Sequence, residues 1–270
     1  MKSSLPGLLV LMALGACSSP EDTAEAIPTD DVSQTTAASS GDDKVIQTVE
    51  GVSVDEQTEL FAFDFSYPKE AAAIPGLKAR LDGELAQARR TLEKEAREAR
   101  AEARDAGFPF NAYSSGTAWK VTGNTPRYLA LVAELYSYQG GAHPNSGTRS
   151  LVWDREAGRA IEPLDLFASP TALGEAISAP YCEALDAARE KRRGIPVDAG
   201  DSTFGACPTV DQLTIVLESS NGKAFDTLGL LADPYVAGPY AEGAYELSLA
   251  VTEAVVQALR PVYREAFRAR

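Results

Sequence analysis

The stretch from Thr117 to Gln139, TAWKVTGNTPRYLALVAELYSYQ, decides the fold because two of its runs alternate between the two sides of an extended chain. In the second run, every second residue from Tyr128 to Tyr138 falls on one face, which is the period of a β-strand. Asn124 to Pro126 separate the two runs. The stretch therefore predicts two antiparallel strands joined by a turn.

Further strands are expected on both sides of this pair. Upstream, ELFAFDFSYP alternates aromatic and polar residues until Pro68 stops it. Downstream, SLVWDREAGRAIE reads as a hairpin with its turn at Glu156 to Gly158. Nearer the C-terminus, QLTIVLES and KAFDTLGLL flank Asn221-Gly222, a dipeptide typical of two-residue hairpin turns, and AYELSLAV follows as a last strand.

Three helical segments complete the pattern. Leucines and alanines recur every three or four residues from Ile74 to Ala106, which predicts a long N-terminal helix. Residues 163–193 read as helical with a break near Pro180, and Ser169 or Thr171 is the candidate cap. The final helix is interrupted at Pro261. Because strands and helices occur in runs, we expect an α+β fold, mainly antiparallel, with helices packed on one face, as one domain or two tightly joined halves.

The chain begins like an exported lipoprotein. Lys2 precedes the short apolar run LPGLLVLMALGA, which ends at Cys17. The residues Leu14 to Cys17 resemble a bacterial lipobox, so residues 1–17 are expected to be a signal peptide and Cys17 the lipidated N-terminus. An ordinary signal peptide is the alternative. Ser18 favours the outer membrane, facing the periplasm, if the host is Gram-negative.

Residues 18–45 are rich in Ser, Thr, Ala and Asp and are expected to form a disordered tether. A flexible coil of this length would hold the folded part, residues 46–270, roughly 30 Å from the membrane. The formal net charge is −14. This charge argues against nucleic acid and anionic lipid as direct partners and favours a basic protein partner.

Export gives the remaining cysteines a meaning. In an oxidising compartment Cys182 and Cys207 are an even pair, and we expect a disulfide, with two free buried thiols as the alternative. The chain has one histidine, so a metal site is poorly supported and no cofactor is expected.

The single histidine, His143, lies in the connection YSYQGGAHPN between two predicted strands. Gly140 and Gly141 accommodate positive φ, and Pro144 extends the residues before it, so a structural turn explains the motif. Contact with a ligand is a second role, for which Asn145 completes the motif. Catalysis is the third.

The catalytic role would need a serine nucleophile, Ser146 or Ser137, and an orienting carboxylate such as Asp154 within reach of His143. A separate loop, DPYVAGPYAEG, holds Tyr235 and Tyr240 beside prolines. These tyrosines either form an aromatic platform for a sugar or a protein or pack over a sheet edge.

The elements YSYQGGAHPN, LVWD, PLDLF and DPYVAGPYAEG together resemble the extracytoplasmic domain of sigma-V-type anti-sigma factors that act as lysozyme receptors. The same region precedes the catalytic module of peptidoglycan deacetylases as an accessory part. The resemblance spans residues 52–262 and implies a deacetylase-accessory-like half, residues 46–139, and an anti-sigma-factor-like half, residues 140–270.

The resemblance implies a fold and the binding of envelope molecules, and no catalytic module is recognised in the sequence. We therefore expect a non-catalytic, lipid-anchored cell-envelope protein that interacts with lysozyme-like proteins or peptidoglycan. An envelope hydrolase centred on His143 and a structural lipoprotein without a dedicated ligand are the alternatives. The candidate binding residues are Gly140, Gly141, His143, Pro144, Asn145, Tyr235 and Tyr240.

Overall fold

The computed structural model describes residues 49–195, 197 and 203–270. The predicted signal peptide, the lipidated Cys17 and the tether lie outside the described residues. The strands are β1 (Val52–Gln57), β2 (Phe61–Tyr67), β3 (Tyr113–Asn124), β4 (Tyr128–Tyr138), β5 (Asn145–Asp154), β6 (Arg159–Ile161), β7 (Thr214–Glu218), β8 (Thr227–Ala232) and β9 (Tyr245–Ala250).

The helices are α1 (Lys69–Ala72), α2 (Pro75–Ala106), α3 (Pro170–Arg193) and α4 (Glu253–Ala258), with the 3-10 turns η1 (Pro163–Leu166), η2 (Val210–Gln212), η3 (Tyr240–Glu242) and η4 (Pro261–Ala266). None of the helices in the described ranges combines the length and the apolar character that a membrane-spanning segment needs.

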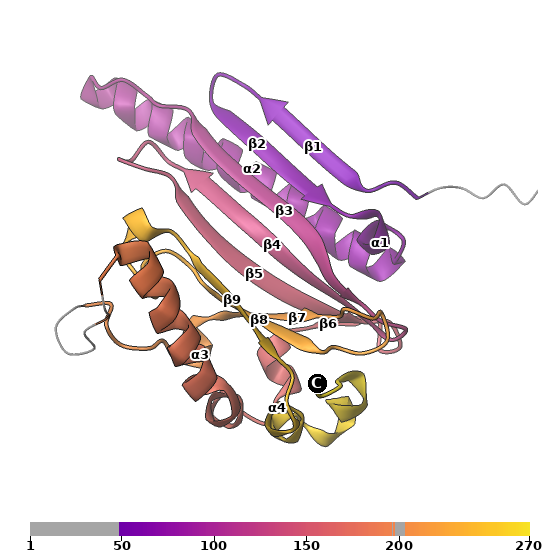
Figure 1. Cartoon of the computed structure of the whole chain (residues 1–270). Helices are drawn as coiled ribbons and strands as arrows, with labels where there is room; N and C mark the ends of the chain where they lie inside the picture. Colours follow the sequence, from indigo (N-terminus) through magenta and orange to yellow (C-terminus); the bar gives the residue numbers. More distant parts are fainter. Residues whose placement is uncertain (1–48, 196, 198–202) are drawn as a thin grey trace, which may run out of the picture. The chain divides into compact units, whose positions relative to one another are not determined.

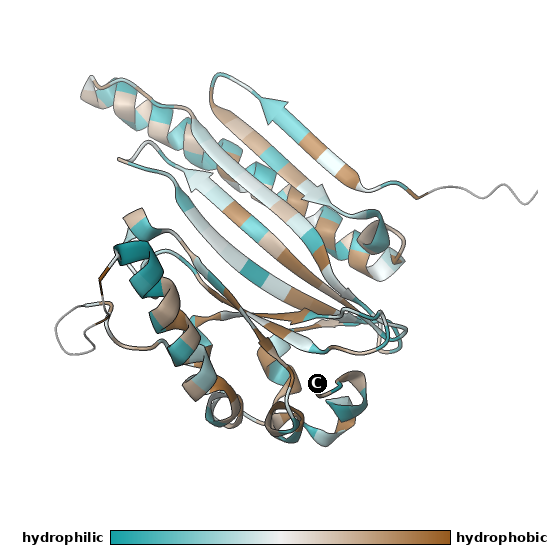
Figure 2. Cartoon of the chain, viewed as in Figure 1, coloured by the Kyte–Doolittle hydropathy of each residue, from teal (hydrophilic) through white to brown (hydrophobic). Residues whose placement is uncertain are grey.

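The strands form two sheets (Figure 1). The first has six strands in the order β1-β2-β3-β4-β5-β6, and the second has three in the order β7-β8-β9. Neighbours are antiparallel except β2 and β3, which run parallel because the long helix α2 connects them. The expected α+β class with mainly antiparallel pairing is confirmed. Strand β1, whose short apolar alternation is visible in Figure 2, was not among the predicted strands.

At the start of β4, the first sheet is buried on both faces. On β4, Leu129, Leu131 and Ala133 point to one side and pack in a core with α2, which lies along that face in Figure 1. Tyr128 and Ala130 point to the other side, into a core shared with the second sheet. Strand alternation distributes consecutive side chains between two cores, which explains the nearly continuous apolar run of β4.

The two sheets are joined by polar contacts as well as by the core. The hydroxyl of Thr122 donates to the Leu217 carbonyl oxygen at 2.8 Å, and that of Ser150 donates to the Ile215 carbonyl oxygen at 2.7 Å. A Cβ atom at Gly123 would come within 2.6 Å of the Phe225 ring, so this strand position requires glycine. Each sheet carries its helix on one face, α2 on the first and α3 on the second.

Helix α3 is continuous, so the predicted break near Pro180 is wrong. Ser169 caps its first turn by accepting from the Ala172 amide at 3.0 Å, as one of the two candidate caps. Pro180 itself is exposed, whereas Ile177 and Tyr181 on either side of it are buried in the core. A proline costs a helix about 3 kcal/mol, and burial of the apolar stripe along both halves offsets that cost.

The predicted hairpin at Asn221-Gly222 is present, because β7 and β8 pair antiparallel, but its connection is wider than a two-residue turn, since eight residues, 219–226, join the strands. Gly222 has φ +67°, but Asn221 instead accepts hydrogen bonds from the next residues through its side chain. Asp226 organises this loop. Its buried carboxylate accepts from the Ser220 hydroxyl at 2.5 Å and lies 2.7 Å from the Arg270 guanidinium. Side-chain bonds within the loop therefore replace the tight turn.

The boundary expected at 139/140 falls in the β4–β5 connection. Strands on both sides of it belong to the six-stranded sheet, and residues from Gln47 to Arg270 form one compact unit. The predicted interruption at Pro261 is present, where α4 gives way to η4.

Candidate functional site

The connection between β4 and β5 holds the single histidine, as the sequence predicted. Gly140 takes φ +79°, whereas Gly141 adopts a φ that other residues also take. Asn145 is already the first residue of β5, paired with Ser137. The turn therefore rests on Gly140 and Pro144 and leaves His143 exposed at its tip.

The structure brings His143 together with both tyrosines of the distant DPYVAGPYAEG loop. Its ring stacks on Tyr240 with 3.9 Å between centroids, and its Nε2 atom lies 3.3 Å from the Tyr235 hydroxyl oxygen. The Tyr240 hydroxyl donates to the Pro144 carbonyl oxygen at 2.9 Å. We call His143, Tyr235 and Tyr240 the aromatic platform. The Tyr235 side of the platform is open, because this residue is 54% exposed.

Tyr235 is held in an unusual backbone conformation. Its φ of 73° makes it the one non-glycine residue with positive φ in the described part of the chain. An L-residue in the left-handed region costs about 1–2 kcal/mol, and such strain tends to persist at functional positions. The Tyr235 amide donates to the Gly238 carbonyl oxygen at 3.0 Å, which closes a short turn around the strained residue. The strained residue therefore lies in a tight loop that its own amide closes, with its side chain exposed.

Asp233 ties the tyrosine loop to the first sheet. Its two carboxylate oxygens accept from the Thr148 amide at 3.0 Å and from the Thr148 hydroxyl at 2.8 Å. Thr148 lies on β5, close to the strand's start beside the His143 turn. These two hydrogen bonds join segments that lie 85 residues apart in the chain. They hold the tyrosine loop against β5, next to the His143 turn.

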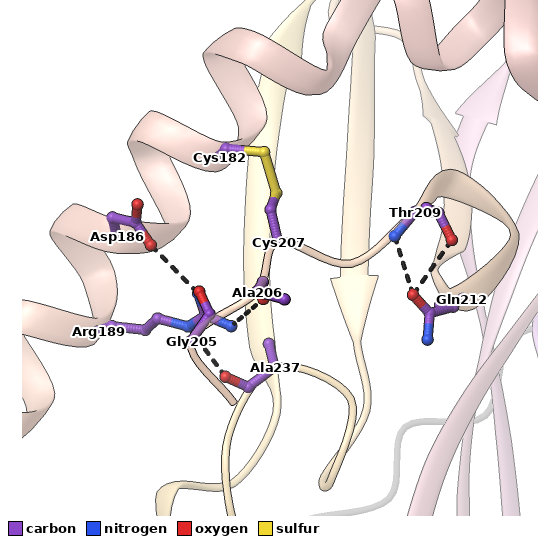
Figure 3. Close-up of a disulfide and its surroundings, with 9 residues drawn as sticks. All are labelled: Cys182, Asp186, Arg189, Gly205, Ala206, Cys207, Thr209, Gln212 and Ala237. Atoms are coloured by element: carbon purple, nitrogen blue, oxygen red, sulfur yellow. Dashed lines mark hydrogen bonds and ion pairs between the residues drawn. A yellow bond between two sulfur atoms is a disulfide. The ribbon is translucent and has the colours of Figure 1, made fainter. Parts of the chain in front are cut away.

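Arg189 of α3 binds the same loop through Ala237 (Figure 3). The side chain is fully buried, and its guanidinium donates to the carbonyl oxygens of Ala237, Gly205 and Ala206 at 3.0, 3.3 and 3.0 Å. It also pairs with Asp186 at 3.1 Å. One buried cation therefore connects the tyrosine loop with the segment that ends at Cys207.

The expected disulfide between Cys182 and Cys207 is present (Figure 3). Cys182 lies on α3, ahead of Arg189 in the chain. It attaches the 205–207 segment to α3 covalently, and Arg189 attaches it through hydrogen bonds. The disulfide and the buried arginine therefore attach the same segment to α3.

The C-terminal turn of α3, which is hydrophilic in Figure 2, binds the end of the tyrosine loop that leads into β9. Arg193 binds the Glu242 carboxylate with two bonds of 2.9 and 3.0 Å, and the Tyr245 hydroxyl donates to the same group. The bond from Arg193 is the main reason that the pKa of Glu242 lies below its usual range, and the bond from Tyr245 adds to it. Arg192 stacks on the Tyr245 ring at 3.9 Å. Basic residues that end a helix are unremarkable in sequence, so their role as loop anchors was missed.

The catalytic triad considered from the sequence is not assembled. The His143 Nδ1 atom lies 2.8 Å from the Pro144 carbonyl oxygen and Nε2 faces Tyr235, so both ring nitrogens have partners that are neither serine nor carboxylate. Asp154 lies at the opposite end of β5, roughly 30 Å along the strand, where Arg127 binds its carboxylate at 2.8 Å. In the described ranges, no group of three or more His, Cys, Asp or Glu side chains is placed to hold a metal ion.

Comparison with known proteins gives one family match. Residues 54–146, about a third of the chain, match the family model described as deacetylase PdaC. This is the part for which a resemblance to the accessory region of deacetylases was expected, and the match supports that resemblance. The anti-sigma-factor resemblance stays a prediction.

Two solved structures show similarity to this chain. A DUF3298-family protein from Bacteroides fragilis has 18% sequence identity and a TM-score of 0.48, covering 74% of this chain and 89% of its own. A DUF3298-family protein from Pseudomonas aeruginosa has 18% identity and a TM-score of 0.48, covering 82% and 96%. A search of curated proteins finds no match.

Proposed function

We propose that the chain is a non-catalytic, lipid-anchored module of the cell envelope that binds a lysozyme-like protein or peptidoglycan through the aromatic platform. The proposal rests on one observation, which is that polar side-chain contacts brace the loops that carry an exposed group of aromatic side chains. His143 and Tyr235 are exposed, yet the loops beneath them are fixed by Asp233 and Arg189.

This bracing is what a binding surface needs. Ordering a loop on binding costs free energy, and a loop that is already ordered avoids this cost. Tyrosine contributes a large contact area with few rotatable bonds and is frequent among residues that dominate binding. The strained φ of Tyr235 keeps its ring presented to solvent before any partner arrives.

The contacts of His143 support binding rather than catalysis. A general base needs a free ring nitrogen next to the group that it deprotonates and an orienting partner on the other nitrogen. Here the ring stacks on Tyr240 and its nitrogens face Pro144 and Tyr235. The histidine acts as the third ring of the platform.

Charge favours the lysozyme-like partner of the two. With a net charge of −14 the chain attracts basic proteins over long range, and the platform supplies short-range contacts. Peptidoglycan remains the alternative ligand, because aromatic faces also stack on sugars. The lipid at Cys17 and the tether would hold the platform within the envelope, where both ligands occur.

The experiment is surface plasmon resonance with the purified full chain immobilised and a basic lysozyme as analyte, with sedimentation on insoluble peptidoglycan in parallel. Raising the salt concentration from about 0.05 to 0.5 M shortens the screening length from about 14 to 4 Å, so the on-rate for lysozyme should fall steeply. The double variant Tyr235→Ala, Tyr240→Ala should mainly raise the off-rate.

Val262→Ala is the matched control, because Val262 is 65% exposed and lies in η4, beyond the far end of β9 from the platform. It should behave as the wild type. Absence of binding to both lysozyme and peptidoglycan at low salt would overturn the proposal and leave a structural role.

A further inference from the structure

A hollow lies beside α2, and none of the three residues of the aromatic platform lines it. It is a groove of about 430 Å³ between α2 and strands β2 to β4. We call it the α2 groove. Its volume lies within the range of small-molecule sites in proteins.

Besides three charged side chains, the lining of the α2 groove is neutral and polar over an apolar floor. Ser115, Thr117 and Ser137 supply hydroxyl groups from the sheet, and Gln87 supplies an amide from the exposed side of α2. The buried ring of Phe65 contributes to the floor. Hydroxyl and amide groups both donate and accept hydrogen bonds, so such walls suit a ligand that does the same.

The hydroxyls appear where the core ends. Every second residue of β3 faces α2, and in this row Trp119 is buried in the core, whereas Thr117 and Ser115 line the groove. On β4 the row changes in the same way from the buried Ala133 to Ser137. Among the described residues, the structure records no side-chain hydrogen bond for Ser115, Thr117 or Ser137. Their hydrogen-bonding capacity is therefore available to a ligand.

The charged residues of the groove are already paired with protein groups. Arg149 donates to Glu84 at 2.6 Å and its guanidinium stacks on Trp119 at 4.7 Å. Glu95 accepts from Gln139 at 3.0 Å. A phosphate or carboxylate ligand would need an uncommitted cation, and the described lining of the groove does not offer one. A lipid tail would need apolar walls rather than hydroxyls.

We propose that the α2 groove binds a neutral oligosaccharide. A sugar ring carries hydroxyl or acetamido groups at its edge and C–H groups on its faces, which matches polar walls over an aromatic and aliphatic floor. This proposal does not rest on the aromatic platform, because the groove and the platform share no residue.

The test is a titration of the full chain with tri-N-acetylchitotriose and with cellotriose, followed by NMR chemical shifts and calorimetry. Saturable binding of at least one trisaccharide is expected, with shifts in residues 114–117 and 137–139. Thr117→Val with Ser137→Ala removes two hydroxyls with little change of volume and should weaken binding about three- to tenfold per hydroxyl. Gln87→Ala, on an exposed helix position, should weaken it by a similar factor.

Two controls separate this site from the platform. Arg90→Ala changes an exposed residue of α2 that does not line the groove, and it should leave the affinity unchanged. Tyr235→Ala with Tyr240→Ala should also leave it unchanged, even though it impairs the platform. No saturable shifts at about 10 mM of either trisaccharide, where binding with a Kd near 1 mM would be evident, would overturn the proposal. Shifts confined to the Tyr235 loop that persist in the groove variant would overturn it equally.

Discussion

Replacing Arg189 by Met tests whether a buried cation holds the aromatic platform in place. Methionine is apolar and long, so it fills most of the same space while removing the hydrogen bonds to Ala237, Gly205 and Ala206. The bonds to Ala237 and Gly205 are buried, so water cannot replace the lost donor at these two carbonyl oxygens without opening the structure.

The expected loss follows from these contacts. A hydrogen bond from a charged donor contributes about 1.5–3 kcal/mol, but the variant also avoids the cost of burying a guanidinium. A buried acceptor left without a donor costs about 1–3 kcal/mol, so for the two buried carbonyl oxygens we expect a loss of about 2–5 kcal/mol. Asp186 adds little, because its side chain is 47% exposed and stays hydrated without the arginine.

The assay is urea denaturation at neutral pH with the disulfide intact, together with hydrogen exchange of the loop amides. The free energy of unfolding should fall by the stated amount, and the amides of Tyr235 and Val236, which bond within the loop, should lose protection. Arg97→Met is the matched control, because Arg97 is 66% exposed on α2, and it should cost less than about 0.5 kcal/mol. A loss below about 1 kcal/mol with unchanged loop protection would refute the role of Arg189 as the loop anchor.

Three further predictions concern stability and one concerns the anchor. Replacing Cys182 and Cys207 by Ser should lower the free energy of unfolding by about 3.5 kcal/mol, the loop entropy for a separation of 25 residues, as measured by denaturation without reductant. Burial raises the pKa of Asp226, but its hydrogen bonds outweigh burial and lower it to about 2. This carboxylate therefore contributes about 2 kcal/mol above pH 4, and that part should disappear as the pH falls from 4 to 2, but not in Asp226→Asn. Ser169→Ala should cost about 1 kcal/mol through the lost helix cap, measurable as a lower urea midpoint. Cys17→Ala should release the protein from membranes without unfolding it, and continued membrane fractionation would argue against lipidation.

The order and type of most elements were predictable because their signals are local. The alternation in β2, β3 and β4 and the leucine spacing of α2 depend only on residues a few positions apart. The cap at Ser169 and the turn glycine Gly140 are likewise local, since each acts on its own backbone.

Where local signals competed with burial, the sequence misled. Pro180 predicts a break, but a core that spans both halves of α3 keeps the helix continuous. Asn221-Gly222 predicts a tight turn, but the carboxylate of Asp226 organises a wider loop. In the first case burial in the core outweighs the local preference, and in the second the hydrogen bonds within the loop and the ion pair with Arg270 outweigh it.

The sequence by itself determined most of the strands and helices, the cysteine pair and the two loops that carry candidate binding residues. Only the tertiary structure decided that His143 stacks on Tyr240, that Arg189 is buried whereas Arg192 is exposed, and that serines of β3 and β4 line a groove. The reason is physical. Strand and helix periods are set by neighbouring residues, whereas a site needs residues far apart in the chain, and their meeting depends on how two sheets and a disulfide-linked helix pack.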